Sequence, residues 1–235
     1  MTDTLRKTAA PRRFAVSGVI LDLDGTLLDT VADLAAAVNA MLADLGRPGL
    51  TLERVRDFVG KGAEVLVHRA LTGEPDGRAD AARFAAALGS FLHHYRRENG
   101  LHARLYEGVV DGLAAMRAAG LRLAVVTNKP HAFTVPLLAQ QGLSGFFELV
   151  VSGDSLPRKK PDPMPMLHVS ERFGVAPARI LAIGDSINDA LAARAAGMPV
   201  VAVPYGYNEG REVQSLDVDA IVETLLQAAS LVDCV

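Results

Sequence analysis

The stretch that most constrains the fold of this chain is GVILDLDGTLLDT, at residues 18–30. Residues 19–21 are apolar and predict a short buried strand, which ends at Asp22 and Asp24. Because side chains alternate between the two faces of an extended chain, we expect both carboxylates on the same side. At a separation of about 5 Å and an effective dielectric of about 20, they would repel one another by roughly 3 kcal/mol.

Such a pair of carboxylates needs a proton, a basic group or a cation nearby, and a divalent metal with oxygen ligands meets this need best. Gly25, directly after the pair, permits a tight turn that a side chain would obstruct. Asp and Gly also end strands as plain turn residues, so this stretch alone leaves an ordinary turn open.

Composition limits the classes of protein to which the chain can belong. Its 235 residues are 50% hydrophobic and 22% charged, enough for one large domain or two unequal ones. A net charge of -3 gives no general attraction to nucleic acid or to anionic membranes, so we expect a small anionic partner held by a local cluster. There is no apolar run of membrane-spanning length and no signal-peptide core, and the single Cys234 lies near the end; these features favour the cytoplasm. The sequence leaves open whether the protein is a monomer or a homo-oligomer.

The order of predicted helices and strands indicates an α/β core with a helical insertion. Residues 1–14 lack periodicity and are predicted to be a disordered lead. Residues 30–104 show only helical patterns, whereas residues 15–29 and 105–235 contain the strands. Strands that alternate with helices predict a Rossmann-like parallel sheet with helices on both faces. Five later strands are expected, at residues 121–126, 149–151, 180–183, 199–203 and 220–222.

Polar residues follow several of these strands, where parallel α/β sheets bind their ligands. Thr127 and Asn128 follow one strand, and Asp185 follows another, with Asp189 one helical turn later. Lys160 lies in a basic loop stiffened by nearby prolines. Each feature alone has a plain explanation as a turn, a solvated loop or a helix cap, but together they predict a site for phosphate and metal.

These motifs resemble those of the haloacid dehalogenase superfamily. Asp22, Asp24 and Thr26 match its first motif, DxDxT, and the later three motifs are matched by Thr127, by Lys160 and by the pair Asp185 and Asp189. The resemblance implies that Asp22 is the nucleophile and Asp24 the acid/base, and that residues 30–104 are a small all-helical cap domain. Because the dehalogenases lack the second carboxylate, Asp24 argues for phosphoryl transfer.

The resemblance also implies a mechanism through an aspartyl-phosphate intermediate. Mg²⁺ would be held by the carboxylates of Asp22 and Asp185 and by the backbone carbonyl of Asp24. The phosphate oxygens would be held by Thr127, the N–H of Asn128 and Lys160. Asp189 would orient Lys160 or a metal-bound water.

Within the superfamily, the segments VGKGAEVLV, TNKP, KKPDP and YGYN are most similar to those of the bacterial phosphoglycolate phosphatases. The implied reaction is hydrolysis of 2-phosphoglycolate to glycolate and phosphate. In the helical insertion, Lys61 and Gly62 form a break between helices, with a cation and flexible backbone that could approach a small anionic leaving group. An exposed linker lysine is the alternative there.

Other functions remain open. A phosphatase for another small sugar phosphate, or a phosphotransferase like β-phosphoglucomutase, would share the core. A 2-haloacid dehalogenase is disfavoured by Asp24. A non-enzymatic phospho-receiver domain is disfavoured because the expected strand at residues 149–151 is followed by Ser152 rather than by a carboxylate. The segment GKGAEV lacks the pattern of a P-loop, which argues against a kinase.

Overall fold

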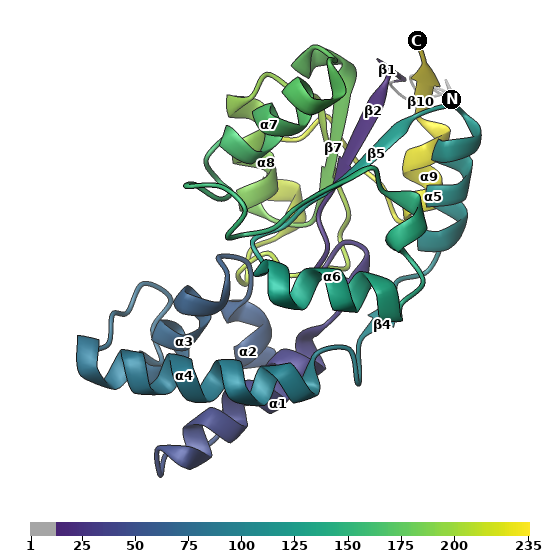
Figure 1. Cartoon of the computed structure of the whole chain (residues 1–235). Coiled ribbons are helices and arrows are strands. Elements are labelled where there is room, and N and C mark those ends of the chain that lie inside the picture. The colour runs from purple at the N-terminus through teal and green to yellow at the C-terminus, as the bar shows by residue number, and fades with distance from the viewer. Residues whose placement is uncertain (1–12) are drawn as a thin grey trace, which may run out of the picture.

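The computed structural model describes residues 13–235 of the chain (Figure 1). Residues 1–12 of the predicted disordered lead lie outside the described residues. The predicted lead extended to residue 14, but Phe14 already begins strand β1 (Phe14–Val16) and is buried. The apolar side chains of Phe14 and Val16 therefore belong to the folded protein.

Within residues 13–235, the main sheet has six parallel strands in the order β6-β5-β2-β7-β8-β9, which confirms the predicted α/β class. Strand β2 (Gly18–Leu21) lies between β5 and β7, and all four of its residues are buried. Burying one large aliphatic side chain contributes roughly 1.5–3 kcal/mol, which explains why this apolar run takes a central position. The other strands are β5 (Arg122–Val126), β6 (Leu149–Val151), β7 (Ile180–Gly184), β8 (Val200–Ala202) and β9 (Ala220–Ile221).

Helices cover both faces of this sheet. In Figure 1, α5 (Val109–Ala118) and α9 (Leu225–Ser230) lie on one side, and α7 (Met164–Phe173) and α8 (Ile187–Ala195) lie on the other. Alternate residues of β2 belong to different apolar clusters, as expected for a strand buried on both faces. The remaining helical elements outside residues 31–98 are α6 (His131–Gln140) and the 3-10 helices η1 (Ser144–Phe146), η2 (Pro177–Arg179) and η3 (Val213–Ser215).

Four helices lie together beyond the carboxyl ends of the central strands (Figure 1). They are α1 (Val31–Asp44), α2 (Leu52–Phe58), α3 (Ala63–Thr72) and α4 (Ala81–Glu98), and we call them the α1–α4 block. They enclose an apolar cluster of their own, to which Phe133 and Tyr207 from outside the block also contribute. The short antiparallel strands β3 (Leu28–Asp29) and β4 (Arg104–Leu105) flank the block in the sequence. The division into a core and a separate cap domain stays a prediction.

Two short elements at the ends of the chain were not expected. Strand β10 (Val232–Cys234) follows α9 and pairs in parallel with β1, so that Phe14 lies opposite Val232. Three-residue strands carry too little alternation to be recognised in the sequence. Among residues 13–235, no helix is both long enough and apolar enough to cross a lipid bilayer.

Candidate active site

The carboxyl ends of β2, β5 and β7 meet at one cavity, which the α1–α4 block closes from the opposite side. Six of the predicted site residues line it: Asp22, Asp24, Thr127, Asn128 and Asp185 at the strand ends, and Gly62 in the helical insertion. The α1–α4 block contributes mostly apolar lining: Leu34, Val59, Ala63, Leu66 and Phe91, together with Gly60, Gly62 and Tyr95. The sheet therefore brings together groups that lie more than 160 residues apart in the sequence.

Asp22, directly after β2, is held by two donors. Its Oδ1 accepts hydrogen bonds from the backbone N–H of Leu23 at 2.7 Å and lies 2.9 Å from Nζ of Lys160. Burial raises the pKa of Asp22 to about 7, against the opposing effect of the Lys160 charge. A second cation near this carboxylate would restore its ionised form.

Lys160 lies beside Asp22, the predicted nucleophile. Its Nζ donates to the backbone carbonyl of Val126 at 2.7 Å and to Oδ1 of Asp189 at 2.6 Å, in addition to its contact with Asp22. Burial acts to lower the pKa of Lys160, but the charges of Asp189 and Asp22 raise it above its ordinary value. Lys160 thus carries a fixed positive charge beside Asp22, with all three of its donors directed at protein oxygens.

Asp189 is a positioning group in this geometry. Its Oδ1 accepts from Lys160, and its Oδ2 accepts from the backbone N–H of Ser186 at 3.1 Å and from the Ser186 hydroxyl at 2.6 Å. The contacts with Ser186 form a capping box at the start of α8. Because Asp189 is buried behind Lys160 and is not among the described residues that line the cavity, it is better placed to hold Lys160 than to bind a ligand directly.

Asp185, after β7, is enclosed by backbone. Its Oδ1 accepts from the Thr26 hydroxyl at 2.7 Å, and its Oδ2 accepts from the backbone N–H of Tyr207 at 2.6 Å. Gly25 approaches so closely that an added Cβ would lie 2.3 Å from Oδ2. Burial raises the pKa of Asp185 well above its usual range, and the neighbouring Asp189 and Asp22 raise it further.

The carboxylates are suited to a divalent cation. Oxygen atoms of Asp22, Asp185 and Asp189 lie within 4.8 Å of one another. Hard oxygen donors of this kind match Mg²⁺, and buried carboxylates this close together require compensating positive charge. Asp22 and Asp185 line the cavity, whereas Asp189 is not among its described lining residues and pairs with Nζ of Lys160 at 2.6 Å, so Asp22 and Asp185 are the carboxylates that fit the ion best.

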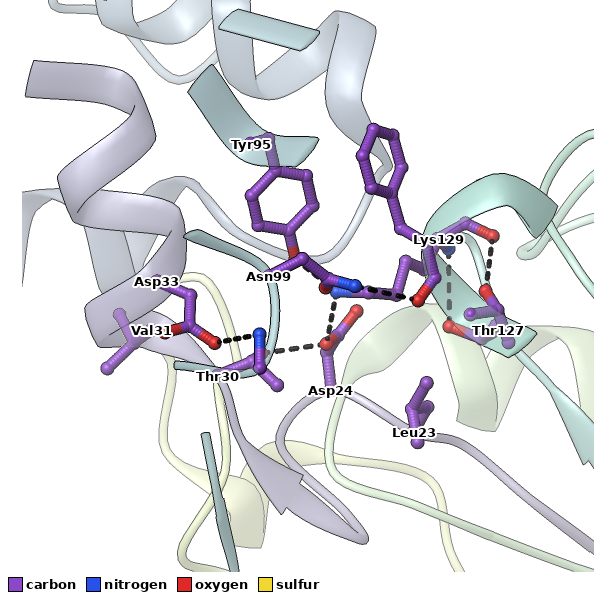
Figure 2. Close-up of polar contacts among 12 residues, drawn as sticks. Leu23, Asp24, Thr30, Val31, Asp33, Tyr95, Asn99, Thr127 and Lys129 are labelled. Carbon is purple, nitrogen blue, oxygen red and sulfur yellow. Dashed lines mark hydrogen bonds and ion pairs between the residues drawn. The ribbon is translucent and has the colours of Figure 1, made fainter. Parts of the chain in front are cut away.

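Asp24 points toward a cation that sequence reasoning did not identify. Its Oδ1 accepts from the Thr30 hydroxyl at 2.7 Å and from Nζ of Lys129 at 3.0 Å (Figure 2). Lys129 is buried and also donates to the hydroxyl of Tyr95, on α4. Burial alone would lower the pKa of Lys129, but the charge of Asp24 and the contact with Tyr95 raise it above its ordinary value. The available signal was the position of Lys129 immediately after Thr127 and Asn128.

Asn128 connects the strand end to two other segments. Its Nδ2 donates to the backbone carbonyls of Gly60 and Lys160, both at 2.9 Å. The Thr127 N–H donates to the backbone carbonyl of Val151, and its hydroxyl oxygen accepts from the Lys129 N–H at 3.2 Å. Among residues 13–235 the hydroxyl proton has no acceptor, so it can be donated to a ligand. Asn128 thus anchors a segment of the α1–α4 block at the cavity.

Lys61 and Gly62, the two residues of the helical insertion predicted to approach the substrate, lie in different surroundings. Gly62 lines the cavity with φ of +86°, and an added Cβ there would lie 2.9 Å from the backbone oxygen of Asn128. The Lys61 side chain instead forms an ion pair with Glu209 at 3.5 Å and is not among the described cavity-lining residues. The expected approach of Lys61 to a leaving group is therefore not the arrangement that the structure contains.

Comparison with known proteins connects this geometry to a family. The sequence model of the haloacid dehalogenase-like hydrolases matches residues 19–203. The chain is 54% identical over 217 residues to phosphoglycolate phosphatase of Thiobacillus denitrificans, covering 92% of this chain and 96% of that protein. It is also 54% identical over 217 residues to phosphoglycolate phosphatase of Nitrosospira multiformis, with the same two shares covered.

A solved structure agrees with the sequence relatives. A protein from Haemophilus somnus, described as a predicted phosphoglycolate phosphatase, has a TM-score of 0.86 to this structure at 34% sequence identity. The match covers 92% of this chain and 97% of the other. The similarity therefore extends over the main sheet, the α1–α4 block and the cavity between them.

Proposed function

Since this chain belongs to the haloacid dehalogenase-like hydrolase family and is a phosphoric monoester hydrolase, we propose that it hydrolyses 2-phosphoglycolate to glycolate and phosphate in a Mg²⁺-dependent reaction. The observation that carries the proposal is the cavity in which Asp22 and Asp24 lie beside Thr127, Asn128 and Asp185. The curated relatives named phosphoglycolate phosphatase support the choice of substrate.

In the proposed mechanism, an Oδ atom of Asp22 attacks phosphorus while the bond from phosphorus to the ester oxygen breaks. Asp24 gives its proton to that oxygen, so glycolate leaves and an aspartyl-phosphate remains. Asp24 then takes a proton from the water that attacks this phosphorus, which releases phosphate and restores Asp22. The position of both carboxylates on one cavity supports this assignment.

The carboxylates of Asp22 and Asp185, with the backbone carbonyl of Asp24, would hold Mg²⁺. When bound, the ion neutralises the negative charge that accumulates where a carboxylate meets a phosphate dianion. Thr127 and the N–H of Asn128 would hold phosphate oxygens. Lys160 adds a fixed positive charge through its contact with Asp22.

We further propose that the α1–α4 block acts as a cap that excludes water. Apolar contacts of Phe133 and Tyr207 join it to the rest of the chain, and polar contacts between side chains and backbone hold it at the cavity. The carbonyl of Gly60 accepts from Asn128, and the buried Arg69 forms an ion pair with Glu209 at 3.0 Å. The apolar lining supplied by the block lowers the local dielectric, which strengthens electrostatic contacts in the closed cavity.

The test is a steady-state assay of a panel of small phosphomonoesters with Mg²⁺. We expect 2-phosphoglycolate to have the highest kcat/KM. A sugar phosphate that exceeds it would reassign the substrate within the same chemistry. Transfer of phosphate to a second hydroxyl, rather than to water, would indicate a phosphotransferase instead.

A further inference from the structure

The ammonium group of Lys129 occupies an unusual position in the cavity. It lies 3.0 Å from Oδ1 of Asp24, contacts the Tyr95 hydroxyl and lies 4.8 Å from the centre of the Tyr95 ring (Figure 2). The Lys129 side chain is only 2% exposed. A cation this deeply buried costs free energy that its partners must offset, so its presence calls for an explanation.

Lys129 is the one basic residue among the described residues that line the cavity. Lys160 contacts Asp22 but is not part of the lining, and Lys61 pairs with Glu209. The facing surface from the α1–α4 block is mainly apolar. Because screening is weak in such surroundings, a carboxylate that entered the cavity would interact strongly with Lys129.

The ammonium group has a donor to spare. A lysine offers three N–H donors, and within residues 13–235 the structure gives Nζ of Lys129 two polar partners, Asp24 and Tyr95. The third donor can therefore bind a ligand oxygen without breaking either contact. By contrast, all three donors of Lys160 already meet protein oxygens.

The position beside Asp24 determines which part of a substrate Lys129 meets. On the proposed function, Asp24 must contact the ester oxygen that leaves. In 2-phosphoglycolate the carboxylate carbon is two bonds from that oxygen, so the carboxylate lies next to Asp24 and hence next to its neighbour Lys129.

We propose that Lys129 binds the carboxylate of the leaving group and thereby selects small phosphomonoesters of hydroxy acids, an inference that rests on the proposed function. Tyr95 holds the ammonium group from the α1–α4 block, and Asp24 holds it from the core. The selection for an acidic leaving group thus depends on a residue at the end of β5, and not on Lys61.

The test compares 2-phosphoglycolate with 2-phosphoglycolamide, in which an uncharged amide of nearly the same shape replaces the carboxylate and the phosphate is unchanged. The ratio of their kcat/KM values cancels any general damage to catalysis. In Lys129→Met, we expect this ratio to fall by about tenfold or more, because the cation is lost while the stem is kept. In the matched control Tyr95→Phe, which keeps the charge, we expect the ratio to stay within about threefold of wild type.

The outcomes separate this inference from the proposed function. If wild type does not hydrolyse 2-phosphoglycolate, the proposed function fails and the inference with it. If wild type hydrolyses the acid and the amide equally well, the proposed function stands and the inference alone is wrong. If wild type prefers the acid and Lys129→Met retains that preference, the inference alone is wrong, and Lys129 only positions Asp24. Should Lys129→Met not fold, Lys129→Gln keeps a hydrogen-bond donor without the charge and is expected to lose the preference in the same way.

Discussion

Gly206 packs against Asp185 so closely that a Cβ added at residue 206 would lie 2.3 Å from Oδ2 of Asp185 and 2.3 Å from the backbone oxygen of Gly25. One of these contacts is with backbone, which cannot swing aside as a flexible side chain can. The position of a proposed metal-binding carboxylate is therefore set by glycines in two separate loops.

Gly206→Ala is expected to displace Asp185 and to weaken Mg²⁺ binding, with a loss of about 10–100-fold in metal affinity. Calorimetric titration with MgCl2 measures this loss directly. Gly145→Ala is the matched control, because a Cβ there would meet no atom within 4 Å. Equal affinities in the two variants would show that Asp185 is not a ligand or that the loop adapts.

Asp22→Asn should lower kcat by several orders of magnitude, because an amide is a poor nucleophile. The protein should remain folded, because the amide keeps the shape of the side chain. Lys160 would retain its contacts with Asp189 and Val126. Circular dichroism checks folding, and rapid quenching of wild type during turnover should trap phosphate on Asp22. Failure to trap it under conditions where substrate is consumed would refute covalent catalysis.

Mg²⁺ affinity should depend on pH. Burial raises the pKa of Asp22 to about 7, and the ion binds the ionised carboxylate, so protons compete with the metal. Affinity should therefore rise with pH and be about tenfold weaker at pH 6 than at pH 8. Titrations with MgCl2 at both values test this, and an affinity that does not change with pH would contradict it.

The sequence could predict that the polar site residues meet at one cavity because a parallel sheet places its strand ends together. Asp22, Asp24, Thr127 and Asp185 each follow an apolar run, and the run alone determines on which edge of the sheet they lie. The fold class and the helical character of residues 31–98 could be predicted from the spacing of apolar residues along the sequence.

The contacts of individual cations could not be predicted in this way. Lys129 meets Tyr95, 34 residues earlier in the sequence, because α4 is placed over the end of β5 by the packing of the α1–α4 block. Likewise, Lys61 turns to Glu209, which lies in a loop after β8. Such pairings depend on how separate segments dock, and no local spacing encodes them.

A buried ion pair between Arg69 and Glu209 attaches the α1–α4 block to the loop after β8. Arg69 is buried and donates to Oε1 of Glu209 at 3.0 Å as well as to the backbone carbonyls of Phe58 and Pro75. Removing one member of a buried ion pair costs about 3–5 kcal/mol. In Glu209→Ala, however, the block can turn away and let water reach Arg69. The cost should therefore appear first as opening of the block, with faster amide hydrogen exchange around Gly60 and a higher KM.

The matched control for this variant is Glu148→Ala, since Glu148 forms an ion pair with Arg122 in which both side chains are more than a third exposed. Exposed pairs contribute at most about 1 kcal/mol, so exchange around Gly60 should match that of wild type in the control. If Glu209→Ala instead lowers the melting temperature and leaves local exchange unchanged, the pair stabilises the whole fold and does not control opening. That result would indicate that the block is held closed by other contacts, those of Gly60 with Asn128 and of Tyr95 with Lys129.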